Sequence, residues 1–238
     1  MHARRSIALL FGLILALFSG LQASADDSVL SVVAVQVNSG QLDTYASRVA
    51  ELQTHMERLG VDGTPVTWQA TAAGPATGTV FVAIQYPSLA SYAAGTAKTN
   101  ADPEFGKLIA GLDDIRSIAS NSLYRNVFGG GGTDAGTLLQ TVTVKVAPGR
   151  LADYVGQLEK LQAIQQRLGS SGTMRAWQAT AAGPNTGNVV VGIIYTDLAT
   201  YAADTQKVQA DAEWQKVIGG LDEIRTIVST GLARRVSP

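Results

Sequence analysis

From residue 33 to residue 37 the hydrophobic positions alternate: Val33, Val35 and Val37 are separated by Ala34 and Gln36. A period of two is typical of a β-strand. Between residues 42 and 59, large apolar residues instead recur at spacings of three and four, which predicts an amphipathic helix. These residues are Leu42, Tyr45, Val49, Leu52, Met56 and Leu59.

Two further apolar segments, residues 66–71 and 80–86, have the length and composition of strands, and the glycines and proline between them predict a hairpin. Ser88 stands where a second helix would begin, and Asp102-Pro103-Glu104 starts another helical turn. A last strand is predicted over residues 115–123. The order β-α-β-β-α-β is that of a ferredoxin-like unit.

The same pattern recurs 109 residues later. The segment from Trp68 to Pro75 is repeated letter for letter from Trp177 to Pro184. Residues 31–127 align with residues 140–236 without a gap, and 49 of the 97 positions are identical. We interpret the chain as a tandem duplication of one unit. Residues 128–137 include four consecutive glycines and are expected to form a flexible linker.

The N-terminus has the features of a secretory signal peptide. Two arginines precede an apolar run of 12 residues, 7–18, and small residues at 23–25 favour cleavage between Ala25 and Asp26. A run of 12 is shorter than the roughly 20 residues that span a bilayer, so a retained anchor is the less favoured alternative. We expect residues 1–25 to be removed, the protein to be periplasmic or secreted, and no stable membrane insertion after cleavage.

Composition excludes several classes of protein. The chain has no cysteine, which excludes disulfides and thiol catalysis, and only two histidines, which leaves little for a histidine-based metal site. A formal net charge of −1 provides no basic surplus for binding nucleic acid. With 46% hydrophobic and 16% charged residues, the chain has ample material for a core.

Several short motifs of the second unit are similar to those of a known group. They are residues 144–151 (Val-Lys-Val-Ala-Pro-Gly-Arg-Leu), 153–154 (Asp-Tyr), 183–186 (Gly-Pro-Asn-Thr), 197–199 (Asp-Leu-Ala) and 211–214 (Asp-Ala-Glu-Trp). In these motifs the chain resembles NIPSNAP and antibiotic-biosynthesis-monooxygenase-like proteins of the dimeric α/β-barrel superfamily.

This resemblance implies the fold. The expected class is α+β, with two tandem ferredoxin-like βαββαβ repeats packed sheet-to-sheet as an intrachain α/β barrel. The first repeat would comprise residues 26–127 and the second residues 138–238. The ten-residue linker favours pairing within one chain, so we expect an intrachain pseudo-dimer, with further oligomerisation left open.

The same superfamily includes haem-dependent enzymes that use a proximal histidine. The only histidine that would remain after cleavage is His55, and the residue 109 positions later is Ile164. We therefore expect no cofactor and no metal. His55 also lacks an orienting partner in the sequence, so we interpret it as an ordinary helix residue and name no catalytic residue.

The candidate ligand-binding residues belong to the repeated segment and its surroundings. They are Trp68, Gln69, Tyr86 and Arg116, with their counterparts Trp177, Gln178, Tyr195 and Arg225. Around a barrel cavity they would offer aromatic walls, amides and cations to a small organic or anionic ligand. The plainer alternative is a packed tryptophan, a hairpin turn and an arginine that nearby carboxylates neutralise.

Three functions remain open at this point. The leading hypothesis is a small-molecule-binding or accessory barrel protein without a bound cofactor. The first alternative is a cofactor-independent monooxygenase or isomerase that orients a small organic substrate. The second alternative is a structural or interaction module whose barrel is filled with side chains.

Overall fold

The computed structural model of the protein describes residues 26–130 and 136–236. The first half contains β1 (Val29–Val37), α1 (Leu42–Arg58), β2 (Thr64–Ala72), β3 (Val80–Tyr86), α2 (Leu89–Ala101), α3 (Pro103–Ala110) and β4 (Arg116–Phe128). The second half contains β5 (Leu138–Val146), α4 (Leu151–Arg167), β6 (Thr173–Ala181), β7 (Val189–Tyr195), α5 (Leu198–Ala210), α6 (Ala212–Gly220) and β8 (Arg225–Arg235). Short 3₁₀ turns lie at η1 (Gly74–Ala76), η2 (Gly183–Asn185) and η3 (Leu221–Glu223).

The predicted element order is present in both halves, with the second helix of each unit divided in two. Each helix and strand of the second half begins 109 residues after its counterpart, as β5 does after β1. The helix starts follow the expected capping. Ser88 accepts a hydrogen bond from the Ser91 amide, and Asp102 accepts one from the Phe105 amide.

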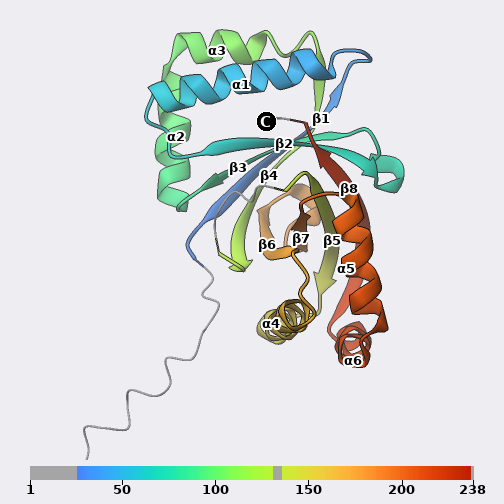
Figure 1. The fold of residues 1–238 in the computed structure, drawn as a ribbon. Helices are drawn as coiled ribbons and strands as arrows, with labels where there is room; N and C mark the ends of the chain where they lie inside the picture. The colour runs from blue at the N-terminus through green and yellow to red at the C-terminus, as the bar shows by residue number, and fades with distance from the viewer. Residues whose placement is uncertain (1–25, 131–135, 237–238) are drawn as a thin grey trace, which may run out of the picture.

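The eight strands form one closed antiparallel barrel in the order β1-β3-β2-β8-β5-β7-β6-β4. The sequence predicted a barrel made of two sheets packed sheet-to-sheet; the barrel is present, but the two sheets are joined by hydrogen bonds at their edges, at two seams, β2 with β8 and β4 with β6. The α1–α3 group and the α4–α6 group lie outside the barrel on different sides (Figure 1).

The last strand of each half is longer than predicted, because its end has a partner in the other half. β4 pairs with β1 from Arg116 onwards and with β6 only over Leu123–Phe128. β8 pairs with β5 along its length and with β2 only over Leu232–Arg235. The predicted ends at residues 123 and 232 thus fall where these seams begin.

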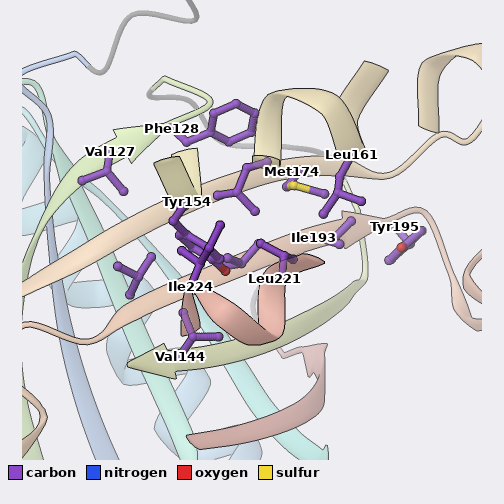
Figure 2. Close-up of a cluster of buried hydrophobic side chains, with 14 of the residues drawn as sticks. Val127, Phe128, Val144, Tyr154, Leu161, Met174, Ile193, Tyr195, Leu221 and Ile224 are labelled. Atoms are coloured by element: carbon purple, nitrogen blue, oxygen red, sulfur yellow. The ribbon is translucent and has the colours of Figure 1, made fainter. Parts of the chain in front are cut away.

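Alternate residues of each strand face the helices and the barrel interior. Val35 and Val80 are buried in a cluster with Tyr45 and Val49 of α1, so this face lies under the helices. The equivalent cluster of the second half includes Val144, Tyr154 and Leu161 (Figure 2). Side chains on the intervening positions, such as Ala34 and Phe81, therefore point into the interior of the barrel.

Two sequence predictions lie outside the described residues. One is the signal peptide, residues 1–25, and the other is the central part of the linker, residues 131–135. Among the residues that are described, no helix is long and apolar enough to cross a membrane.

Candidate functional site: a pocket at one mouth of the barrel

A pocket of about 270 Å³ opens at the end of the barrel where the β6–β7 hairpin lies. Five of its residues come from strands β4, β5, β6, β7 and β8 at positions that face the interior, and one from the outer side of β8. Two more come from the hairpin. The lining residues are Tyr124, Thr143, Ala179, Asn185, Asn188, Val190, Val228 and Ser229. We call this space the mouth pocket.

The mouth pocket offers hydrogen bonds without charge. Its polar groups are one phenol, two carboxamides and two aliphatic hydroxyls, beside a small apolar wall. Burial raises the pKa of Tyr124, which a hydrogen bond with Ser122 only partly offsets. The Tyr124 hydroxyl therefore stays protonated at neutral pH and acts as a donor or acceptor, but not as an anion.

At the positions related to the mouth pocket by the 109-residue offset, the side chains are less polar. Six of the eight lining residues differ from their counterparts 109 positions away, whereas about half of the aligned chain is identical. Asn185 corresponds to Ala76 and Val190 to Phe81. Thr79, the counterpart of Asn188, accepts a hydrogen bond from Gln36 Nε2 at 2.8 Å. The two sides of the barrel mouth, which correspond to each other in the two repeats, thus differ in both free volume and hydrogen-bonding capacity.

The predicted tryptophans face the barrel interior. Trp68 lies opposite Phe81 on β3 and Arg235 on β8, and Trp177 lies opposite Val190 on β7. Both rings are buried, with 5% and 6% of their surface exposed. Because Val190 lines the mouth pocket, Trp177 is the sequence-predicted residue that adjoins it.

The predicted glutamines lie at the seams of the barrel. Gln69 accepts hydrogen bonds from Arg234 of β8, and Gln178 accepts hydrogen bonds from Arg125 of β4. These contacts join the two halves of the chain. The structure therefore gives both amide oxygens a partner within the fold.

The predicted tyrosines lie under the helices and not in the interior. Tyr86 packs with Met56 and Val61, and its ring meets Tyr92 edge-on at 5.3 Å. Tyr195 belongs to the core cluster of the second half (Figure 2). Burial raises the pKa of each of these phenols to about 12.

The predicted arginines also lie on the helix side. Arg116 Nη1 donates to the Tyr45 hydroxyl at 3.4 Å, and its guanidinium carbon lies 5.8 Å from the centre of that ring. Arg225 lies near enough to Tyr154 to influence its pKa and pairs with Asp222 at 3.8 Å. Trp68, Gln69, Tyr86 and Arg116 therefore occupy three separate places and do not surround one cavity, because adjacent strand residues face opposite sides.

His55 lies near the end of α1, beside Asp102 and Glu104. Its Nδ1 lies 3.1 Å from Arg58 Nη2, which also pairs with Asp102 at 2.9 Å and Glu104 at 3.3 Å. The second half repeats this arginine pairing in Arg167, Asp211 and Glu213 without a histidine. The pairing with arginine therefore explains the acidic residues.

The described residues do not fit a histidine-ligated haem. His55 is their only histidine, and it lies at the outer end of α1, where its ring nitrogen is next to Arg58 and not in a cavity. We therefore derive no chemistry through haem.

Comparisons with known proteins show the fold. No known family and no curated protein matches the sequence. A candidate monooxygenase from Fusobacterium nucleatum is similar in structure, with a TM-score of 0.58 and 12% identity over 89% of this chain and 93% of that one. A candidate monooxygenase from Lactobacillus acidophilus has a TM-score of 0.59 and 7% identity over 89% of this chain and 94% of that one. An anthrone oxidase-like protein has a TM-score of 0.59 and 12% identity over 91% of this chain and 94% of that one.

Chlorite dismutase-like structures are also similar, with a TM-score of 0.54 and 9% identity for one of them over 89% of this chain and 96% of that one. The chain therefore has the dimeric α/β-barrel fold that these proteins share. The narrower resemblance to NIPSNAP stays a prediction.

Sequence reasoning missed the mouth pocket, since its residues come from five strands and a hairpin. The signal that could have found it is divergence between the two repeats. The candidate residues were chosen because they are identical in both, whereas the pocket is formed where the repeats differ.

Proposed function

We propose that this protein binds one small, uncharged organic molecule in the mouth pocket. The observation that carries the proposal is the concentration of hydrogen-bonding groups on one side of the barrel mouth, where the opposite side has Ala76 and Phe81. Two carboxamides and a protonated phenol suit a ring that carries hydroxyl or amide substituents. A volume of about 270 Å³ limits the ligand to a compact molecule of at most about three fused rings.

The test uses 4-hydroxybenzamide as a probe and toluene as a control without polar groups. Titrations followed by amide NMR are expected to shift Thr143 and Asn188 saturably with the probe and not with toluene. The variant Asn185→Ala/Asn188→Thr, which gives the hairpin the residues of the first half, should weaken binding at least tenfold. Thr79→Ala in the first half should leave it unchanged. Equal binding of probe and toluene, or an unaffected hairpin variant, would refute the proposal.

A second candidate is a cofactor-independent monooxygenase, which the candidate monooxygenases and the anthrone oxidase-like protein among the structural neighbours favour. Oxidation of anthrone consumes one O₂ and yields anthraquinone and one water, with the substrate supplying the electrons. No side chain that lines the mouth pocket ionises near neutral pH, so the substrate would have to lose its proton without a base there. Oxygen uptake with anthrone, equal to the anthraquinone formed and lost in Val190→Phe, would favour this candidate.

We also propose that the protein arose by tandem duplication and works as an intrachain pseudo-dimer. The 109-residue offset of all seven strands and helices in each half supports this, as does the closure of the barrel by strands of one chain. Export to the periplasm or the medium is part of the same proposal and rests on the N-terminal sequence.

A further inference from the structure

A second pocket of about 270 Å³ lies on the outside of the first half. It is formed by the loop after α1 and by one face of α2, away from the barrel mouth. Its lining residues are Gly60, Val61, Asp62, Ala90, Ser91, Ala94, Gly95 and Lys98. We call it the α2 pocket.

In the second half, a side-chain carboxylate of the protein itself fills the equivalent place. Asp204 is the counterpart of Gly95 and is only 3% exposed. Its carboxylate accepts hydrogen bonds from Ser170 Oγ and the Ser171 amide, both at 2.9 Å, and from Lys207 Nζ at 3.0 Å. The chain therefore shows that a carboxylate suits the lysine at this position.

In the first half, the groups that hold this carboxylate have changed, but the lysine has stayed. Val61 and Asp62 replace the two serines, and Gly95 has no side chain. A methyl of Val61 lies 2.8 Å from where a Cβ of Gly95 would be, so it occupies the base of the site. Lys98, the counterpart of Lys207, donates to the Gly60 carbonyl oxygen at 2.6 Å, as Lys207 does to that of Gly169 at 3.5 Å, but has no carboxylate beside it like that of Asp204.

The α2 pocket thus presents two opposite charges that the fold does not neutralise. Within residues 26–130 and 136–236, Lys98 pairs with no carboxylate and Asp62 pairs with no cation. A simple anion would be attracted by Lys98 but repelled by Asp62. A simple cation would be attracted by Asp62 but repelled by Lys98. A molecule that carries both charges can satisfy both groups.

We propose that the α2 pocket binds a small zwitterion of the α-amino acid type. The ligand carboxylate pairs with Lys98, as Asp204 does with Lys207, and the ligand ammonium pairs with Asp62. The Ser91 hydroxyl is a further polar group in the lining. The small residues Gly60, Ala90, Ala94 and Gly95 leave room for the backbone of such a molecule but little for a large side chain.

The test compares glycine with acetate and ethylammonium, which each carry only one of its charges. Titrations followed by the amide resonances of Asp62 and Gly95 are expected to show glycine binding at least tenfold more tightly than either control. Lys98→Met should weaken glycine binding at least tenfold, because it removes the charge from an exposed side chain. The matched variant Lys207→Met should leave glycine binding unchanged.

A second variant installs the arrangement of the second half. Val61→Ser/Gly95→Asp gives the first half its own carboxylate, which should compete with the ligand and abolish glycine binding. Binding of 4-hydroxybenzamide at the mouth pocket should persist in Lys98→Met, which separates this proposal from the one above. Glycine binding no tighter than that of acetate, or insensitive to Lys98→Met, would overturn the inference.

Discussion

Gln69 accepts two hydrogen bonds from Arg234 across one seam of the barrel, from Nε at 3.1 Å and from Nη2 at 2.8 Å. Gln178 and Arg125 repeat this contact at the other seam, at 2.9 Å and 2.6 Å. Because each pair joins the two halves, barrel closure alone accounts for the presence of this glutamine in both copies of the repeated segment.

Loss of this contact should weaken the seams. Gln69→Ala and Gln178→Ala are each expected to lower the free energy of unfolding by about 0.5–1.5 kcal/mol, the usual net value of a hydrogen-bonded contact. The double variant should show the sum, since the two contacts lie at different seams. Urea unfolding measures this, with Gln206→Ala on the exposed face of α5 as a control. Single variants as stable as Gln206→Ala would contradict it.

The difference in size between Phe81 and its counterpart Val190 predicts that the free volume at the barrel mouth controls ligand binding. Val190→Phe places a ring in the mouth pocket and should reduce 4-hydroxybenzamide binding at least tenfold. Overpacking should cost about 1–3 kcal/mol of stability, so binding is measured well below the unfolding temperature. Val190→Ile adds less volume and serves as the control. Unchanged affinity in Val190→Phe would place the ligand elsewhere.

The buried carboxylate of Asp204 predicts that the protein and its Asp204→Asn variant differ in how their stability depends on pH. Burial by itself would raise the pKa of Asp204, but hydrogen bonds from Lys207, Ser171 and Ser170 hold it below its ordinary value of 3.8. A carboxyl with a lowered pKa stabilises the fold above about pH 3.8 and loses this contribution as the pH falls through the pKa of the folded state.

Asp204→Asn should therefore lower the free energy of unfolding by about 1–3 kcal/mol at pH 7, because the buried donors lose a charged acceptor. The difference from the unaltered protein should shrink below pH 3.8. Urea unfolding at several pH values measures it, with the exposed Asp43→Asn as a control. A difference that stays constant down to pH 2 would show that the charge of Asp204 does not contribute.

The local parts of the fold were predictable from sequence because local rules govern them. Alternation indicated β1, a spacing of three and four indicated α1, and Asp102 marked the start of α3. The far ends of β4 and β8 were not predictable, since residues 126–128 have their strand partner only in β6 and Arg235 only in β2, that is, in the other half of the chain.

The direction of the side chains was also beyond sequence reasoning. Outside the exposed runs 117–121 of β4 and 226–230 of β8, most strand residues are covered on either face, by helices or by the barrel interior, so hydrophobicity does not distinguish the two faces. Tyr86 and Phe81 are both apolar residues of β3, yet Tyr86 lies under the helices and Phe81 faces the interior. For this reason the predicted site combined residues that the fold separates.

The proposed export predicts the mass of the mature chain. Intact-mass analysis of protein from the periplasm or the medium is expected to show a chain that begins at Asp26, because small residues precede it and the apolar run is short. Full-length chain recovered from the membrane fraction would instead support the retained anchor.

Arg116 and Arg225 were predicted to touch the ligand, and their contacts now predict a different outcome for their removal. Arg116 lies over the Tyr45 ring, and the Arg225 side chain is only 7% exposed beside Tyr154. Both Arg116→Met and Arg225→Met keep the apolar length of the side chain, but the first loses the contact with the Tyr45 ring and the second loses a buried cation that pairs with Asp222. Each should lower the free energy of unfolding by about 1 kcal/mol.

Binding of 4-hydroxybenzamide should stay unchanged in the double variant, since neither arginine lines the mouth pocket. Loss of binding with unchanged stability would mean that the ligand lies under the helices and not in the barrel mouth.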